Sequence, residues 1–187
     1  MSTEKPLKLS IRRVGVTTQD DAENHNFVDK IIKQLPKGDV KAICAIIMDY
    51  DSGDVGRVTR DALPSPVWNE IGASKAKKIL TECQEEGRRE TLTFNPIWEK
   101  GEKLSSYDVL HEVGHVVYDN LPVGATPERQ FWIDRANIED ISHKGVVANL
   151  KAGRGSLTHE YFADHYARCH LGDQTIPKQE RDKLHCT

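Results

Sequence analysis

The sequence predicts an α+β fold, with its few strands early in the chain and helices late. Three short segments have strand-like patterns, and all of them precede residue 97. From there on, apolar residues recur at helical spacing in several segments. This order favours an α+β fold over a doubly wound parallel sheet. At 187 residues, with 37% hydrophobic residues, the chain has the size of one domain, which we expect over residues 1–187.

The strand predictions rest on β-branched residues and on alternation. A short strand is expected at 7–16, within a polar arm that covers residues 1–20. Residues 40–48 are apolar and β-branched, as in a buried strand. Residues 90–96 alternate, with Leu92 and Phe94 on one face, and Pro96 places this strand at a sheet edge.

Helices are predicted where apolar residues share a face and capping residues stand at the ends. Asp20 or Asp21 caps the first helix, and Ser105 with Asp108 has the spacing of a capping box. Gly87 and Gly172 end two of the others. Of the segments between them, 152–156 is expected to be a loop, and 49–73 a long loop for which a short helical turn is left open. The predicted helices are 20–35, 74–87, 105–120, 128–139 and 158–171.

Charge and hydropathy exclude two classes of protein. The formal net charge is -3 and the sequence pI is about 6.2, whereas a nucleic-acid binder normally shows a basic domain or stripe. The longest apolar run, from Ala42 to Met48, is far shorter than the roughly 17–25 residues of a membrane span. The first 20 residues lack the apolar block of a signal peptide. We therefore expect a cytoplasmic protein, one exported by a route independent of a signal peptide, or a fragment of a longer precursor.

The four cysteines are too sparse for a disulfide scaffold, and none has CxxC spacing. A thiolate zinc cluster is therefore not expected. Cys44 lies in an apolar run and is interpreted as core packing. Pairing of Cys169 with Cys186 is left open.

The helix at 105–120 contains the sequence HEVGH, from His111 to His115. Residues four apart share one face of a helix, so the two imidazoles can bind one zinc ion at about 2.0–2.1 Å. Glu112 is rotated by about 100° from His111 and can reach a water on the metal without being a ligand. Two histidine ligands and one general base are the arrangement of zinc metallopeptidases.

Gly114 is unusual within this apolar helix. Glycine in a helix interior costs about 1 kcal/mol relative to alanine. We expect another backbone to pack closely where the side chain is missing.

A catalytic zinc site usually has three protein ligands and one position for water. The third is predicted 45 positions after His115, in the segment HEYFADHYARCH, where Glu160 and Asp164 share a helix face. We assign Glu160 as the ligand. Asp164 is expected to accept a hydrogen bond from a ligand imidazole and so orient it. One zinc ion per chain is therefore predicted.

HExxH followed by ExxxD resembles the gluzincin class of zinc metallopeptidases. HEVGH with EYFAD is similar, more narrowly, to the catalytic domain of the anthrax lethal factor family, over residues 105–170. The resemblance implies His111, His115 and Glu160 as ligands and Glu112 as general base. It also implies a zincin-like fold, in which a small sheet packs on the active-site helix and an edge strand borders the cleft. Residues 90–96 are our candidate for that strand, pairing with an extended peptide substrate.

The chain departs from that family at one position. The family has a catalytic tyrosine seven residues before the third ligand, where this chain has Gly153. The donor that stabilises the oxyanion is therefore unassigned. The candidates are Tyr107 and Tyr118 on the ligand-bearing helix, and His143, Arg154, His159 and His165 outside it.

Together these patterns predict a zinc-dependent endopeptidase in which Glu112 is the general base toward the water that the metal activates. The resemblance also suggests a toxin or effector. A zinc hydrolase of a non-peptide amide and a non-catalytic zinc-binding regulatory domain are the alternatives. Glu112 favours an enzyme, because a binding module needs no base beside its ligands.

Overall fold

The computed structural model describes residues 6–11, 16–53, 55–97 and 103–186. The chain divides into two compact units, Met1–Val109 and Leu110–Thr187, each of which is described by itself. The fold is mixed α and β with a small sheet, as the sequence predicts. Whether the whole chain acts as one domain stays a prediction.

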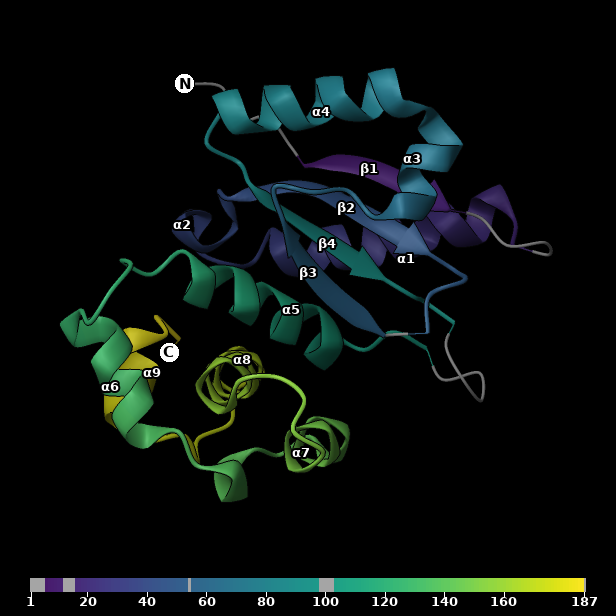
Figure 1. Ribbon diagram of the computed structural model, residues 1–187. Helices are drawn as coiled ribbons and strands as arrows, with labels where there is room; N and C mark the ends of the chain where they lie inside the picture. Colours follow the sequence, from purple (N-terminus) through teal and green to yellow (C-terminus); the bar gives the residue numbers. More distant parts are fainter. Residues whose placement is uncertain (1–5, 12–15, 54, 98–102, 187) are drawn as a thin grey trace. The chain divides into compact units, whose positions relative to one another are not determined.

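The first unit contains the four-stranded sheet shown in Figure 1. Its strands are β1 (Leu7–Ile11), β2 (Ile43–Asp49), β3 (Gly56–Arg60) and β4 (Glu90–Phe94), in the order β1-β2-β4-β3. The first two and β4 run parallel, and β3 is antiparallel to β4. All seven residues of β2 are buried, which explains its unbroken apolar sequence.

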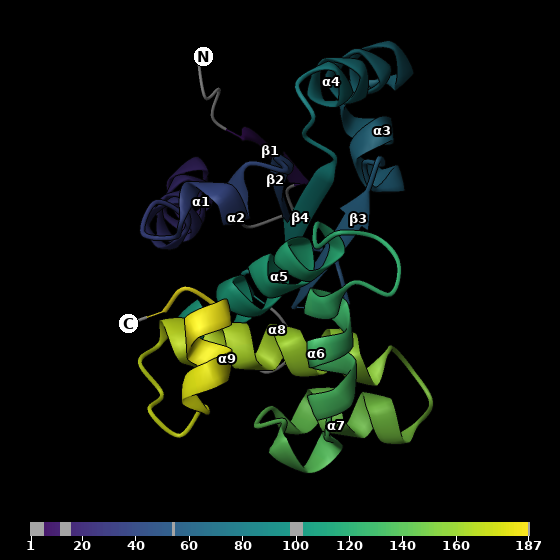
Figure 2. The same ribbon diagram turned by 90° about the vertical axis from the view of Figure 1, so that its left-hand side faces the viewer.

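Helices cover both faces of this sheet (Figures 1 and 2). On one face lie α1 (Thr18–Ile32) and α2 (Lys37–Val40), and on the other α3 (Ser65–Ile71) and α4 (Ala73–Glu85). The N-cap of α1 is Thr17, in a capping box with Asp20, rather than one of the two predicted aspartates. Ala45 and Ile47 of β2 form a core cluster with Val67 of α3 and with Ala76 and Ile79 of α4.

The prediction that 90–96 is an edge strand is wrong. The strand itself exists as β4, but it pairs with β2 on one side and β3 on the other. Pro96 lies beyond the last residue of the strand, so its missing N–H removes no ladder bond. The described edges of the sheet are β1 and β3.

The segment 49–73, expected to be a loop, holds both β3 and α3. The sequence of β3 is GRVTR, in which Val58 is the one apolar residue, so no apolar alternation marks the strand. At the other end of the unit, the predicted strand at 7–16 is confirmed over Leu7–Ile11, and residues 12–15 lie outside the described residues.

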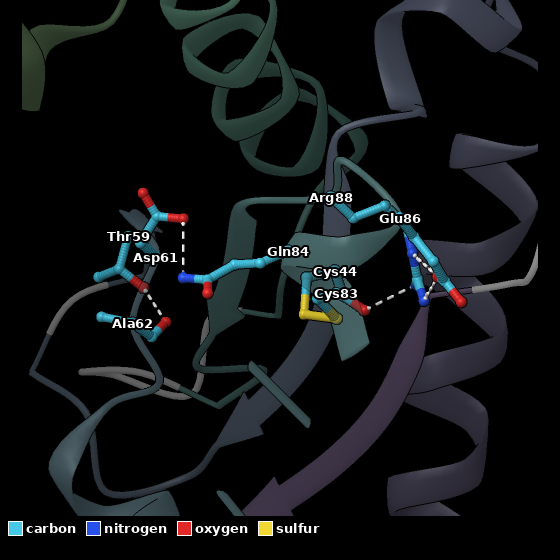
Figure 3. Close-up of a disulfide and its surroundings, with 8 residues drawn as sticks. All are labelled: Cys44, Thr59, Asp61, Ala62, Cys83, Gln84, Glu86 and Arg88. Atoms are coloured by element: carbon cyan, nitrogen blue, oxygen red, sulfur yellow. Dashed lines mark hydrogen bonds and ion pairs between the residues drawn. A yellow bond between two sulfur atoms is a disulfide. The ribbon is translucent and has the colours of Figure 1, made fainter. Parts of the chain in front are cut away.

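A disulfide joins Cys44 of β2 to Cys83 of α4 (Figure 3). Both residues are buried, as predicted for Cys44, but as a bridge rather than as core thiols. Beside it the Arg88 side chain donates to the Cys44 carbonyl oxygen at 3.3 Å and pairs with Glu86. This bridge fixes α4 against the centre of the sheet.

The second unit is helical. Its helices are α5 (Ser106–Asp119, which begins in the first unit), α6 (Pro127–Arg135), the 3-10 turn η2 (Ile138–Asp140), α7 (Lys144–Lys151), α8 (Leu157–His170) and α9 (Lys178–Lys183). The sequence predicts α5, α6 and α8 but not α7 or α9. The capping box of α5 is confirmed, since the Ser105 N–H donates to the Asp108 carboxylate at 2.8 Å and the Asp108 N–H donates to the Ser105 hydroxyl oxygen at 3.2 Å.

A second disulfide joins Cys169, in the last turn of α8, to Cys186 beyond α9. The pairing that the sequence left open is therefore present. Among the described residues, no helix is both long and apolar enough to cross a membrane.

Candidate metal centre

Helix α5 carries the group that can hold a metal. His111, Glu112 and His115 each offer one ligand atom, and these atoms lie within 4.8 Å of one another. All three residues are at most 8% exposed. The rings of the two histidines meet edge to face, with their centroids 4.7 Å apart. The i, i+4 spacing thus produces the converging pair that the sequence predicts.

Gly114 brings the backbone of α8 against α5. A β-carbon at this position would lie 2.8 Å from Ala163 Cα and 3.1 Å from Tyr166 Cβ. Real β-carbons essentially never come that near to a backbone atom, so the crossing of the two helices requires glycine. This confirms the expected close backbone and explains the helix-propensity cost. Ala163 is three residues after Glu160, so the same crossing fixes where Glu160 stands.

Glu160 completes the convergence. Its Oε2 atom lies 3.2 Å from His111 Nε2 and 3.7 Å from His115 Nε2. Ligand atoms about 2.0–2.2 Å from a tetrahedral zinc ion are about 3.3–3.6 Å from each other. The side chain of Glu160 is 21% exposed, so solvent reaches this side of the group. Donor types and spacings therefore fit a zinc ion.

The two imidazoles have opposite pKa shifts. Burial lowers the pKa of His111, but the hydrogen bond to Glu160 and the charges of Glu112 and Glu160 outweigh burial, and the net shift is upward. Burial, together with the charges of His111 and His159, holds the pKa of His115 well below its ordinary value. The neutral His115 has a lone pair to offer. A cation between His111 and Glu160 would displace the proton that they share, as metal binding does in general.

Asp164 is fully buried one turn after Glu160. Its Oδ1 accepts from the N–H and the hydroxyl of Ser142 and from the N–H of His143, and its Oδ2 pairs with Arg168. Its charge also contributes to the raised pKa of His111. These contacts show that Asp164 anchors the start of α7 to α8. The predicted bond to a ligand imidazole stays a prediction.

The other predicted residues are placed differently. Tyr107 lies on α5 one turn before His111 and is half-buried. Tyr118 is buried, and its ring contacts Phe162, His159 and the guanidinium of Arg129. His165 does not join the two histidines of α5 in any described contact, because its Nδ1 lies 3.0 Å from the Tyr161 carbonyl oxygen and its Nε2 3.6 Å from Glu180.

A further pair flanks the group. The His159 ring lies against the His115 ring, with centroids 4.4 Å apart and planes tilted by 31°, and its Nε2 lies 2.9 Å from Asp119 Oδ1. The sequence names His159 only as one of several candidates and misses Asp119. The available signal is the spacing, since Asp119 follows His115 by four residues and His159 directly precedes Glu160.

Gly153, which replaces the tyrosine of the resembling family, has a local role. It follows α7 with φ +75°, and its N–H donates to the Leu150 carbonyl oxygen at 2.9 Å. Glycine is the preferred residue for this left-handed helix end. The loop that it opens leads to Gly155, which packs against Glu160.

Comparison of the chain with protein-family models, with curated proteins and with solved structures finds no match in any of the three. Function is therefore argued from the geometry of this group.

Proposed function

We propose that the chain is a zinc-dependent endopeptidase, with His111, His115 and Glu160 as the zinc ligands and Glu112 as the general base. The main support for the proposal is that the Glu160 carboxylate lies 3.2 Å from the Nε2 atom of His111 and 3.7 Å from that of His115. The Glu112 carboxylate stands beside these residues on α5 and also offers an oxygen to the group; we assign it as the base rather than as a ligand. Two histidines, one carboxylate and an adjacent base are the donor set of catalytic zinc sites in peptidases.

A zinc ion held there supplies Lewis acidity, which lowers the pKa of a water and polarises a carbonyl oxygen. The chain's own groups do the rest. Glu112 accepts the proton of the attacking water and delivers it to the leaving amine, which requires a carboxylate beside the ligands but off the metal. The partly exposed Glu160 leaves the group open to a substrate from one side.

A peptide is the substrate class that we favour over a non-peptide amide, on the strength of the motif alone. Any peptide that adds a strand to the sheet of the first unit pairs with β1 or β3, because β4 has neighbours on both sides. This replaces the expectation of an extended substrate along 90–96. A non-catalytic zinc module remains the alternative outside enzymes, and Glu112 is the residue that separates the two.

The decisive experiment measures zinc content and cleavage of a peptide library by the parent chain and by Glu112→Gln. The variant should hold one zinc per chain and lose activity by about 10³-fold or more, because an amide cannot accept the proton of the water. Glu128→Gln, the same change on an exposed residue of α6, should leave both unchanged. Equal cleavage by Glu112→Gln and the parent would refute the role of Glu112. A parent that binds zinc but cleaves nothing would favour the non-catalytic module.

A further inference from the structure

Arg154 lies in the loop that passes over Glu160. A β-carbon added to Gly155 would lie 3.3 Å from Glu160 Oε1, so the loop backbone comes close to this carboxylate. Consecutive Cα atoms are about 3.8 Å apart, which puts the Cα of Arg154 within about 9 Å of the same oxygen. An arginine side chain extends about 6–7 Å from its Cα. Its guanidinium can therefore reach a molecule bound at the proposed zinc ligands.

The backbone of Arg154 is bonded to the end of α7 and lies between two glycines. Its N–H donates to the Asn149 carbonyl oxygen at 2.9 Å, which ties it to the end of α7. Gly153 and Gly155 flank it with φ of +75° and +85°, conformations that other residues rarely adopt. Arg154 itself is exposed. The loop therefore presents a long cationic side chain from a backbone that is hydrogen-bonded to α7.

The charge of Arg154 is also available. The guanidinium groups of the other arginines in the second unit all have partners. Arg129 donates to carbonyl oxygens around Tyr118, Arg135 to Gln179 and Arg181 to Gln174, and Arg168 pairs with Asp164 and Asp173. No described residue makes such a contact with Arg154. The nearby carboxylate of Glu160 is engaged by His111 and His115.

We propose that Arg154 binds a carboxylate of the peptide substrate beside the proposed metal ligands, and so selects acidic peptides. A guanidinium matches a carboxylate with two parallel hydrogen bonds, a geometry that lysine does not reproduce. The carboxylate comes either from an aspartate or glutamate side chain or from the C-terminus of the substrate. The inference rests on the proposed function, since it names the substrate class of that site.

The test measures binding rather than cleavage, with the full-length Glu112→Gln chain loaded with zinc. The probes are fluorescein-labelled peptide pools that carry Asp or Asn at one fixed position in turn, each prepared as a free acid and as an amide. We expect about tenfold tighter binding of carboxylate-bearing pools, in the range of a charge-assisted hydrogen bond at an exposed site. A preference that persists in the amides identifies a side-chain carboxylate. A preference confined to the free acids identifies the C-terminus.

Three variants of the same chain test whether Arg154 is responsible. Arg154→Met should abolish the preference, and Arg154→Lys should retain part of it. Lys151→Met, which removes another exposed cation three residues earlier, should leave it intact. Equal binding of all pools, with or without a carboxylate, or an unchanged preference in Arg154→Met, would overturn the inference.

Cleavage by chains that retain Glu112 separates the two proposals. If the parent cleaves no peptide but prefers acidic pools through Arg154, the proposed function fails and the assignment of Arg154 stands. If Arg154→Met lowers the cleavage of every peptide equally and leaves binding unchanged, Arg154 acts on the reaction and not on a substrate carboxylate. That result would also overturn the inference.

Discussion

Helix α8 contributes to two side-chain clusters in which histidine lies close to glutamate, and the two clusters differ in their polar contacts. Toward α5, Glu160 meets His111 and His115; we call these three residues the ligand cluster. Toward α9, His165 lies 3.6 Å from Glu180, which also contacts Tyr161 and Arg135; we call these four the α9 cluster. Both clusters are built around a glutamate and histidine.

In the α9 cluster, a tyrosine hydroxyl, a guanidinium and an imidazole surround the Glu180 carboxylate. The Tyr161 hydroxyl donates to the Glu180 carboxylate at 3.3 Å, and the Arg135 guanidinium lies 3.8 Å from it. His165 is near the Tyr161 carbonyl oxygen through Nδ1 and near Glu180 through Nε2. Glu180 is 2% exposed, and burial raises its pKa. This cluster has the partners that a buried structural network needs.

The ligand cluster has a different composition, because two imidazole nitrogens approach the same carboxylate. One carboxylate oxygen faces two imidazole nitrogens, and no arginine or tyrosine hydroxyl contributes to the described contacts between them. When a cation takes the place of the proton between His111 and Glu160, both imidazole Nε2 atoms and the Glu160 oxygen can act as acceptors toward it. The proposed metal site therefore differs from the α9 cluster in bringing two imidazole nitrogens to one carboxylate oxygen.

The difference between the two clusters is tested most directly by replacing glutamate with glutamine in each of them. Glu160→Gln should lower zinc affinity by about 100-fold or more, since losing a ligand costs more than losing one of its hydrogen-bonding partners. Glu180→Gln should leave zinc affinity within a few-fold of the parent. Titration of metal-free protein with zinc against a competing chelator measures both. Equal losses would mean that the two clusters do not differ in the way described.

A change at the helix crossing should affect the ligand cluster through packing. Gly114→Val adds a β-carbon that would lie 2.8 Å from Ala163 Cα, with two methyl groups beyond it, so α5 and α8 must move apart. We expect a loss of about 3 kcal/mol in the free energy of unfolding and weaker zinc binding. Gly38→Ala, on α2 with nothing within 4 Å of the new β-carbon, is the control and should be close to neutral. Denaturant unfolding of both variants, with and without zinc, measures these effects. An unaltered zinc affinity in Gly114→Val would show that zinc binding does not depend on the packing of α5 against α8.

The smallest expected effect concerns pH and the α9 cluster. The folded-state pKa of Glu180 lies above its ordinary value of 4.5, so the folded chain binds this proton more tightly than the unfolded chain. Stability from this residue is present below about pH 4.5 and is lost as the pH rises through the folded-state pKa. Glu180→Gln titrates in neither state. The Tm of this variant should therefore rise relative to the parent as the pH rises above about 4.5, as followed by thermal unfolding at several pH values, and a constant difference would contradict it.

The ligand cluster was predictable because each member depends on local geometry. His111 and His115 are one helical turn apart, and Glu160 lies on a strongly patterned helix of its own. Gly114 indicated that another backbone segment packs against α5, because glycine in a helix interior lowers stability unless the missing side chain allows a close contact.

The features that the sequence did not predict depend on long-range pairing or on short elements. Nothing in 90–96 indicates that β3 will pair with it, and Pro96 pointed to an edge although it stands outside the ladder. The bridge from Cys44 to Cys83 spans 39 positions and became visible only in the fold. His165 lies on the same helix as Glu160, yet its position around α8 turns it toward Glu180.

The crossing at Gly114 has a consequence for how the chain would take up the proposed zinc ion. Small zinc modules fold only around their ion, and so the binding energy is spent on ordering the chain. Here the backbone contact between Gly114 and Ala163 positions both ligand-bearing helices through protein atoms alone. Stripping the ion should leave a template of the same shape, so that reconstitution is fast, reversible and independent of refolding.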